Sequence, residues 1–343
     1  MGVLLCLLTL LYAAGEIPVT SPGMTGGGPG MTDEDLIRSC NDNGPGKPER
    51  LVMFWNLENF FDYRDGGGGS SDTEFSPKGG RHWTGRRFYT KCNAIAKALL
   101  WMGGKYGRMP DVIGFAEVEN AFVLRRLLQS TILRKLDYGI VHRESPDNRG
   151  IDVALLYRKS VFDTLSVSLR KMYDDRGLLL HTRGILCVTL GDRRDGSVCH
   201  FLVNHHPSKY GGSETSSLRR KAAVLTLRHL ADSLGPPIVA MGDFNDTPDN
   251  PVYGLLEGPL TCRADSLCKA GRGTIRYEGK WELIDLFFTT PALPCRMEIV
   301  EVPFLLTRDS PNAGWKPLRT YSGPRYAGGV SDHLPVVLRV QKK

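Results

Sequence analysis

Short apolar runs, each bounded by polar or turn-forming residues, recur along most of the chain. Runs of roughly 4–8 apolar residues between turn signals are typical of buried strands. The runs that predict strands are Leu51–Trp55, Val112–Val118, Ile151–Tyr157, Ile185–Leu190, His200–His205, Ile238–Met241, Leu283–Phe288 and Leu334–Val340.

Apolar residues at helical spacing separate several of these strands. One set steps by four, three and four residues, which places its members on one helical face: Phe88, Cys92, Ile95 and Leu99. The same steps recur further along in Ala223, Leu227, Leu230 and Leu234. Leu124 and Leu128 predict a third helix near residues 120–135. With an antiparallel hairpin predicted over 185–205, this mixture favours two packed sheets flanked by helices, in one domain of residues 49–343.

The first residues form the single apolar run that could concern a membrane. Val3–Ala14 contains no charge but falls short of the about 20 residues that a membrane span needs. It resembles the apolar region of a secretory signal, with a cleavage site before Gly15. We therefore expect a signal peptide at 1–14, a Gly/Pro-rich linker at 15–48, no stable membrane span and a secreted or periplasmic protein. Since no basic residue precedes the run, a mis-assigned start or a buried first strand, with a cytoplasmic protein, stays open.

Composition excludes some classes of protein and favours one class of partner. Hydrophobic residues make up 41% and charged residues 24% of the chain, which is ordinary for a globular protein and excludes a disordered or fibrous one. The formal net charge of +7 favours a polyanionic partner such as nucleic acid or acidic head groups. Charge alone does not decide this, because many basic proteins bind neither.

The eight cysteines form no zinc-binding pattern, since no C-x-x-C pair occurs. Cys187 and Cys199 flank the turn GDRRDG and could face each other across the predicted hairpin. Cys262 and Cys268 could close a short loop. The alternative is that these residues serve as small buried hydrophobic side chains.

Acidic, amide or histidine side chains stand at the ends of six predicted strands. They are Asn56-Leu57-Glu58-Asn59, Glu117, His205-His206-Pro207-Ser208, Asp243-Phe244-Asn245, Asp285 and Ser331-Asp332-His333. A single residue of this kind is usually part of a turn. Six together indicate a site, because folds carry their chemistry on the loops at strand ends.

This set of residues suits metal-assisted hydrolysis of a phosphoester. Carboxylates and carboxamides bind Mg²⁺ through oxygen, and the cation neutralises phosphate charge. Asp243 and Asn245 are two residues apart, which places both side chains on one side of an extended segment. No G-x-S-x-G and no G-x-x-x-x-G-K-[ST] occurs, which disfavours acyl transfer by a serine nucleophile and a P-loop nucleotide hydrolase.

Six motifs together resemble those of the endonuclease/exonuclease/phosphatase superfamily: FWNLEN, GFAEVEN, RGIDVALLY, VNHHPSK, GDFNDTP and GGVSDHLP. That group includes deoxyribonuclease I, the abasic-site endonucleases, neutral sphingomyelinases and inositol-polyphosphate 5-phosphatases. The resemblance covers residues 49–341 in the family order, and its motifs are most similar to those of bacterial secreted members. It implies a four-layer α/β/β/α sandwich with the site at one edge between the sheets.

On the metal side, the resemblance implies that Glu117 is the principal ligand of Mg²⁺, with Mn²⁺ as an alternative. The resemblance implies that Asn56 and Glu58 are further metal-binding residues, although the position of Glu58 often carries Asp in the family. Asp332 would serve the metal or orient a histidine.

On the catalytic side, the resemblance implies that Asp243 orients or deprotonates the attacking water and that Asn245 helps to hold it. His333 would bind the scissile phosphate, with Asp285 fixing its tautomer. His205 would contact phosphate or protonate the leaving oxygen.

The resemblance is less direct for three further residues. It implies that His206, in a slot that often holds a bulky aromatic residue, forms a wall of the site. Arg149 and Asp152 lie at the start of a predicted strand, and Asp152 either faces the site or caps a turn.

The favoured function is a Mg²⁺-dependent endonuclease, exonuclease or general phosphodiesterase that acts, as a monomer, on nucleic acid or another phosphodiester. The second hypothesis is a lipid or inositol phosphate hydrolase, for which Val302–Leu306 (VPFLL) could be a membrane-facing loop, although a buried strand is favoured there. The third is a binding protein without catalysis. The intact Glu117, Asp243 and His333 argue against it.

Overall fold

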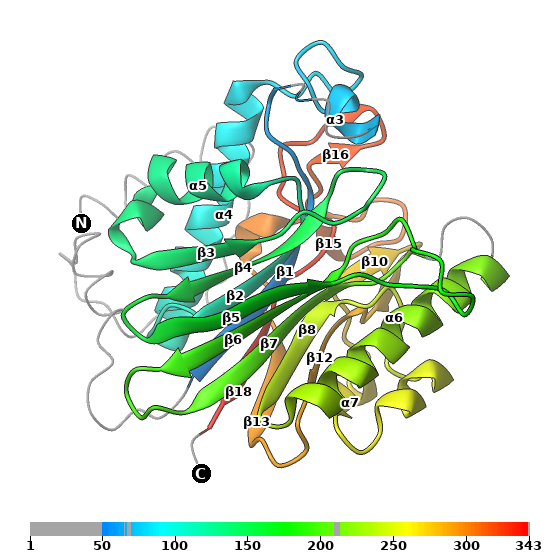
Figure 1. Ribbon diagram of the computed structural model, residues 1–343. Coiled ribbons are helices and arrows are strands. Elements are labelled where there is room, and N and C mark those ends of the chain that lie inside the picture. Colours follow the sequence, from blue (N-terminus) through cyan, green and yellow to red (C-terminus); the bar gives the residue numbers. More distant parts are fainter. Residues whose placement is uncertain (1–49, 65, 67–69, 209–212, 342–343) are drawn as a thin grey trace.

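The computed structural model describes residues 50–64, 66, 70–208 and 213–341 (Figure 1). The predicted signal peptide and linker lie outside the described residues, as does most of the Gly-rich segment 65–69. Among the described residues, no helix is both long enough and apolar enough to cross a membrane.

Two six-stranded mixed sheets form the centre of the molecule. The order in the first sheet is β13 (Cys295–Ile299), β18 (Val336–Val340), β1 (Arg50–Phe60), β2 (Val112–Val118), β4 (Asp152–Arg158) and β3 (Tyr138–His142). The order in the second is β5 (Phe162–Arg170), β6 (Ile185–Asp192), β7 (Val198–His205), β8 (Ile238–Asp243), β12 (Asp285–Thr289) and β9 (Thr261–Cys262). Two parallel pairs matter for the site: β1 with β2, and β7 with β8.

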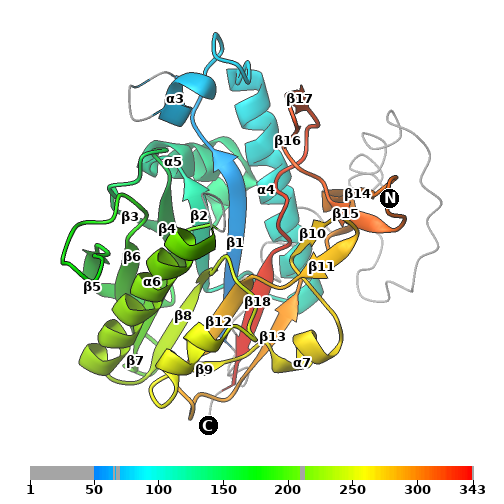
Figure 2. The same cartoon turned by 90° about the vertical axis from the view of Figure 1, so that its right-hand side faces the viewer.

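Helices cover the outer faces of both sheets (Figures 1 and 2). The first sheet carries α4 (Gly85–Tyr106) and α5 (Ala121–Ser130), and the second carries α6 (Ser213–Leu234). Alternation along β1 explains the layers: Val52 and Phe54 pack between the sheets, whereas Met53 packs under α4 and α5. The predicted four-layer α/β/β/α sandwich is therefore confirmed.

Short elements fill the connections between these layers. The helical ones are α3 (Ser70–Glu74), α7 (Asp265–Lys269), η1 (Ile132–Lys135), η2 (Pro251–Leu256) and η3 (Pro303–Leu305). Three small hairpins follow β8: β10 (Ile275–Tyr277) with β11 (Lys280–Glu282), β14 (Leu306–Arg308) with β15 (Trp315–Pro317), and β16 (Tyr321–Ser322) with β17 (Arg325–Tyr326).

The helix predicted from its apolar spacing is α4, and its ends follow known capping rules. Phe88, Ile95 and Leu99 are fully buried. The Thr84 hydroxyl accepts a hydrogen bond from the Arg87 backbone N–H at the start of α4. Gly107 ends it with φ 66°, the left-handed conformation that glycine adopts without strain.

The predicted disulfide pairings are wrong. The 185–205 hairpin forms, but its register places Cys187 opposite Leu202 and Cys199 opposite Leu190. These two cysteines, as well as Cys262 and Cys268, are free. For Cys187 and Cys199, the alternative of a small buried hydrophobic side chain is the one observed.

The strand predicted at Val302–Leu306 is also wrong. Pro303 has no backbone N–H and a fixed φ, and the segment forms the 3-10 helix η3 instead. Val302, just before η3, and Leu305 within it are both buried, so the segment presents no continuous apolar loop to a membrane.

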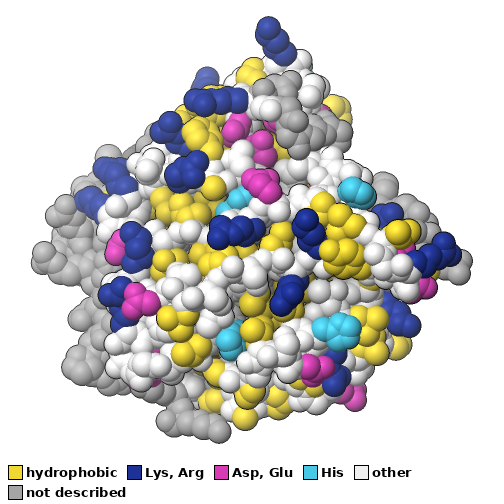
Figure 3. All heavy atoms as spheres, in the orientation of Figure 1, with side chains coloured by type: hydrophobic (Ala, Val, Ile, Leu, Met, Phe, Trp, Pro, Cys, Tyr) yellow, Lys and Arg dark blue, Asp and Glu magenta, His cyan; other side chains and the backbone are white. Residues whose placement is uncertain are grey.

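The surface reflects the basic composition. On the face in Figure 3, Lys and Arg side chains are spread widely, whereas Asp and Glu side chains are fewer and gather partly in the upper half.

Candidate active site

The polar residues at the ends of the central strands converge where the two sheets meet. Asn56 lies on β1 and Asp243 ends β8, and the Asn56 Nδ2 donates a hydrogen bond of 3.0 Å to the Asp243 Oδ2. His205 ends β7, and its Nε2 lies 3.7 Å from the Asp243 Oδ2 and 4.0 Å from the Glu117 Oε1 on β2. The carboxyl ends of parallel strands in both sheets therefore form one cluster.

A histidine–aspartate pair completes this cluster. Asp285 begins β12 directly opposite Asp243, and its Oδ2 lies 2.8 Å from the His333 Nδ1. The His333 Nε2 points toward Asp243, with 3.8 Å between it and the Oδ2. Trp55 fixes the loop before β18 by donating from its indole to the His333 carbonyl.

The two histidines of this cluster differ in charge. Burial alone would lower the pKa of His333, but Asp285 and Asp243 hold it well above its ordinary value. Burial lowers the pKa of His205 well below its ordinary value, and Arg183 and Arg149 lower it further. At neutral pH His333 is thus cationic and His205 neutral.

Asp243 is a buried carboxyl group with an unusual proton affinity. Burial raises its pKa to about 7, and Asp285 adds to this while His333 opposes it. Its Oδ1 accepts a hydrogen bond from the Asn245 backbone N–H, and the Asn245 side-chain amide donates to the His206 carbonyl. The Asp-x-Asn motif therefore forms one tight turn at the end of β8.

Backbone strain is concentrated at these strand ends. Glu58, Asn59, Glu117 and Asn245 have φ values of 45°, 53°, 59° and 51°. The left-handed region is unfavourable for residues with a side chain, and such strain is often found at functional sites. The β1–β2 pairing is also irregular between Asn56 and Phe60, so that the chain turns its polar residues toward the site.

Glu117 has one carboxylate oxygen that is held and one that faces the cluster. Its Oε2 accepts a hydrogen bond of 2.7 Å from the Asn59 N–H and lies 3.6 Å from the Arg149 Nη2. Its Oε1 faces His205. This arrangement leaves the Oε1 available for a cation.

Glu58 and Asp332 are joined by an arginine that no sequence motif identified. Each carboxylate oxygen of Glu58 accepts a hydrogen bond, Oε1 from Arg319 and Oε2 from the Thr320 N–H. The Arg319 Nη2 also lies 2.9 Å from the Asp332 Oδ2. Burial and Asp332 raise the pKa of Glu58 to about 7. Arg319 lies between two short hairpins, where local sequence carries no signal for it.

Lys91 is a second residue near the site that the sequence motifs did not identify, although its position along α4 was a signal for it. It lies three residues after Phe88 and four before Ile95, on the apolar face of α4. A lysine on such a face needs buried partners: its Nζ donates to the Glu58 carbonyl at 2.6 Å and to the Thr320 hydroxyl at 2.8 Å.

His206 lies behind the site as a fully buried ring. Neither ring nitrogen has a hydrogen-bond partner within the described part of the chain, and the ring packs edge-on against Phe244 with centroids 4.6 Å apart. Burial lowers its pKa to about 3, with Arg183 and Arg220 contributing.

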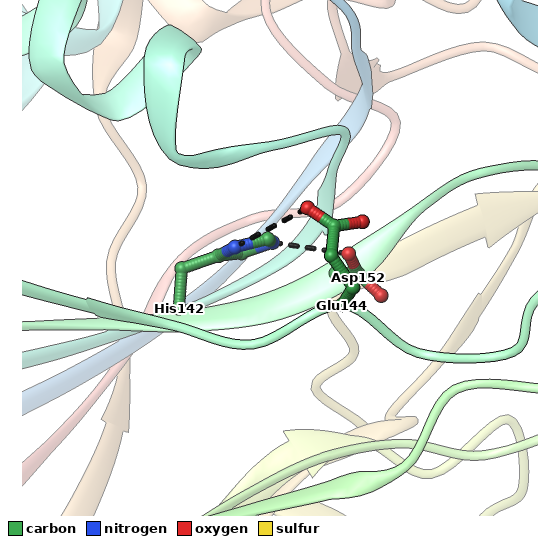
Figure 4. A group of neighbouring side chains, drawn as sticks. All are labelled: His142, Glu144 and Asp152. Carbon is green, nitrogen blue, oxygen red and sulfur yellow. Dashed lines mark hydrogen bonds and ion pairs between the residues drawn. The ribbon is translucent and has the colours of Figure 1, made fainter. Parts of the chain in front are cut away.

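Asp152 holds a turn next to the site. Figure 4 shows the His142 imidazole pointing toward the carboxylates of Asp152 and Glu144. The Asp152 Oδ2 lies 3.0 Å from the His142 Nε2, and its Oδ1 accepts a hydrogen bond from the Ser145 N–H. Of the two roles open for Asp152, these contacts support the turn, which leads to Arg149.

The donor atoms at the strand ends fit a divalent cation. Among the described residues, Asp243, Asp285 and His333 form one group whose ligand atoms are close enough to share an ion, and His142, Glu144 and Asp152 form another. Asp285 already binds the His333 Nδ1, so it orients the histidine. The Oε1 of Glu117 accepts no hydrogen bond from the described residues and faces His205, and an oxygen donor of this kind suits a hard cation.

Comparison with known proteins agrees with this geometry. The sequence matches the family described as Endonuclease/Exonuclease/phosphatase family over residues 51–342. Comparison with curated proteins gives no match.

Several solved structures share the fold at low sequence identity. The human Nocturnin catalytic domain with bound sulfate is 18% identical, with 86% of this chain and 93% of that chain covered and a TM-score of 0.54. A mannosyl-6-phosphatase from Bacteroides thetaiotaomicron is 16% identical, with 85% and 100% covered and a TM-score of 0.53. D. rerio TDP2 complexed with single strand DNA product is 15% identical, with 86% and 99% covered and a TM-score of 0.51. Animal and bacterial proteins both occur, so a special likeness to bacterial secreted members stays a prediction.

Proposed function

The chain belongs to the endonuclease/exonuclease/phosphatase family of phosphoester hydrolases, and on this premise we propose that it is a divalent-metal-dependent phosphodiesterase acting on nucleic acid. The observation that carries the proposal is that the His205 Nε2 lies within 4.0 Å of carboxylate oxygens of both Glu117 and Asp243 at the seam of the two sheets. The Asp285–His333 pair beside them supplies a fixed, charged imidazole.

In the proposed reaction, Asp243 accepts a proton from the attacking water. A general base works best when its pKa is close to the working pH, and the pKa of Asp243 is about 7. Asn245 helps to hold the water and the phosphate from the same turn.

His333 is proposed to donate its Nε2 proton in a hydrogen bond to a phosphate oxygen. Asp285 occupies the Nδ1, which leaves the Nε2 proton directed at the site. His205 is neutral and more suited to a hydrogen bond with the phosphate than to protonation of the leaving oxygen.

Glu117, Asn56 and Asp332 are proposed to hold Mg²⁺, or Mn²⁺ in its place, with Glu58 at the rear of the same group. The cation would neutralise phosphate charge and favour the transition state. Glu58 is the member whose two oxygens already accept hydrogen bonds, so its contribution is to hold Arg319 and Asp332 in position.

A nucleic-acid substrate is favoured by charge. The net charge of +7 and the wide distribution of Lys and Arg in Figure 3 suit a polyanion. The DNA product described for D. rerio TDP2 supports the same class. The lipid alternative is less favoured because Val302 and Leu305, its proposed membrane loop, are buried.

The test is a substrate panel with the purified protein in Mg²⁺. Plasmid DNA, RNA, inositol trisphosphate, sphingomyelin and bis(p-nitrophenyl) phosphate are compared, each with wild type and Asp243→Asn. We expect hydrolysis of DNA or RNA and of the chromogenic diester, lost in the variant. Cleavage of sphingomyelin or the inositol phosphate alone would overturn the nucleic-acid assignment, and no cleavage of any phosphodiester would overturn the activity.

A further inference from the structure

A cavity of about 360 Å³ opens beside the proposed metal side of the site. Its walls come from α3, from the segment after it, from the loop before β4 and from the β16–β17 hairpin. The charged residues that line it are Glu58, Glu74, Arg81, Arg149 and Arg319.

The cavity adjoins the proposed catalytic groups directly. Arg149 lies on the wall that it shares with Glu117, where the Nη2 is 3.6 Å from the Oε2. Arg319 lies on the same boundary, 2.9 Å from Asp332. A group bound in the cavity would therefore lie next to a phosphate bound at the metal side.

The three arginines retain hydrogen-bond donors for a ligand. Arg81 donates from Nε to Glu74 and from Nη1 to the Gly323 carbonyl. Arg149 donates from Nη2 to Asn59, and Arg319 uses Nε and Nη2. Within the described residues, Arg81 Nη2, Arg149 Nη1 and Arg319 Nη1 donate to no protein acceptor, and guanidinium groups match phosphate geometry.

The lining carries three guanidinium groups and two carboxylates, Glu58 and Glu74. Two of the guanidinium groups also pair with carboxylates at the boundary of the cavity, Arg149 with Glu117 and Arg319 with Asp332. The cavity would therefore bind an anion through its unused guanidinium N–H donors and not through a net positive charge.

Aromatic rings give the far wall a fixed shape. The Arg81 guanidinium lies 5.8 Å from the ring centre of Phe75 and 5.3 Å from that of Tyr321. These two rings meet edge to face with centroids 6.0 Å apart, and Trp83 packs behind both. Arg81 is thus held in place before any ligand arrives.

We propose that this cavity binds a second, non-scissile phosphate of the substrate, carried as a phosphomonoester on the group next to the scissile bond. The proposal rests on the proposed function for the position of the scissile phosphate. α3 and the β16–β17 hairpin form two walls of the cavity, which would accept the phosphorylated end of a substrate. It thereby selects for chain ends and small bisphosphates.

The kinetic test compares thymidine dinucleotides with one scissile diester: unphosphorylated, 5′-phosphorylated and 3′-phosphorylated. Wild type should cleave one phosphorylated form about 10-fold to 100-fold more efficiently, in kcat/KM, than the unphosphorylated form. This preference should vanish in Arg81→Gln and return in part in Arg81→Lys. The surface variant Arg296→Gln should retain it, since this residue is exposed on β13.

Glu74→Gln separates ligand binding from a structural role. Removal of its negative charge should increase the preference for the phosphorylated form. If the Glu74–Arg81 pair had only a structural role, Glu74→Gln and Arg81→Gln would instead lower this preference equally. Equal rates on all three dinucleotides in wild type, or a preference that survives in Arg81→Gln, would overturn the proposal.

A binding measurement in EDTA distinguishes this failure from failure of the proposed function. Calorimetric titration with thymidine 3′,5′-bisphosphate should show binding to wild type that is about 10-fold weaker in Arg81→Gln, with thymidine as the negative probe. Such binding without any hydrolysis of dinucleotides would contradict only the proposed activity. Equal affinity in wild type and Arg81→Gln would contradict the proposal that the cavity binds a phosphate.

Discussion

Opposite charge states of two histidines within one buried cluster follow from their immediate partners. His333 has Asp285 at 2.8 Å and therefore keeps its proton despite burial. The nearest carboxylate oxygens to the His205 Nε2 are 3.7 Å and 4.0 Å away, while burial and two arginines lower its pKa. One side chain type thus supplies a cationic donor and a neutral partner in the same site.

The different charge states and positions of His333, His205 and His206 predict that their substitutions have unequal effects on turnover. His333→Ala should slow turnover about 10²–10³-fold, the range for loss of one preorganised hydrogen-bond donor to the reacting group. His205→Ala should also slow turnover strongly, whereas His206→Ala should cost far less, because His206 lies behind the site. Steady-state kinetics measures this after circular dichroism has confirmed the fold. A larger loss in His206→Ala would show that the two roles are exchanged.

His206 also predicts a pH dependence of stability. Its folded pKa of about 3 is below the unfolded value of 6.5, so the unfolded state binds the proton first and stability is lost as pH falls from 6.5 toward 3. At pH 5 the loss is roughly 2 kcal/mol. His206→Phe should remove this loss, as seen in urea denaturation at pH 7 and pH 5. An identical change in the free energy of unfolding for both proteins would refute it.

At the scale of elements, the loop between β3 and β4 places Arg149 on the site. Asp152 ties the loop to His142 and to the Ser145 N–H, and Asp147 ties it to Arg183 at 3.1 Å. Arg149 then reaches Asn59 at 2.6 Å. The loop thus holds the Arg149 guanidinium next to Glu117.

Asp152→Asn tests this positioning role. Loss of the charged acceptor should destabilise the protein by about 1–3 kcal/mol and weaken apparent substrate binding, seen as a KM raised about 10-fold, with a smaller change in turnover. Urea denaturation and steady-state kinetics measure the two effects. The control is Asp163→Asn, which affects an exposed ion pair on β5. If turnover instead slowed about 100-fold while KM stayed unchanged, Asp152 would have a direct catalytic role.

The central strands could be predicted from sequence, but the edge strands could not. β2 spans the predicted Val112–Val118, because it is buried on both faces and reads as a continuous apolar run. β5 at a sheet edge reads FDTLSVSLR and is largely exposed, so it carries no such signal. β3 and β13, which end the first sheet, were missed for other reasons: β3 is mostly buried but reads only YGIVH, and β13 reads CRMEI, which mixes charged with apolar residues.

Some residues of the site could likewise be predicted from the sequence, and others could not. The strand-end acids and histidines were found because each follows an apolar run directly. Arg319 was missed because its partner Glu58 is 261 positions away and the turns that separate Arg319 from Asp332 carry no repeat. Contacts of this kind are fixed by tertiary structure, and no local pattern encodes them.

At the scale of the whole molecule, activity depends on the spacing of the two sheets, since one contributes Glu117 and Asn56 and the other Asp243 and His205. Gly114 is the point of close approach. A Cβ added there would lie 3.0 Å from the Met241 side chain and 3.2 Å from Phe54. A side chain at this position therefore requires Met241 and Phe54 to move by a few tenths of an ångström.

Gly114→Val should push the sheets apart. We expect a loss of about 1–3 kcal/mol or more in the free energy of unfolding, together with slower turnover as the Asn56–Asp243 hydrogen bond lengthens. Gly104→Ala on α4 is the matched control, because a Cβ there meets nothing within 4 Å and alanine favours a helix. Wild-type stability and rate in Gly114→Val, measured by thermal denaturation and kinetics, would refute the packing argument.

The central claim is metal-dependent cleavage of a phosphodiester at the seam of the sheets, and the hydrolysis rate of bis(p-nitrophenyl) phosphate in EDTA and in Mg²⁺ tests it most directly. The rate should fall to background in EDTA and return with Mg²⁺ or Mn²⁺, and the same Mg²⁺ concentration should fail to restore Glu117→Gln. Undiminished turnover in the chelator, or full activity of Glu117→Gln in Mg²⁺, would contradict the account.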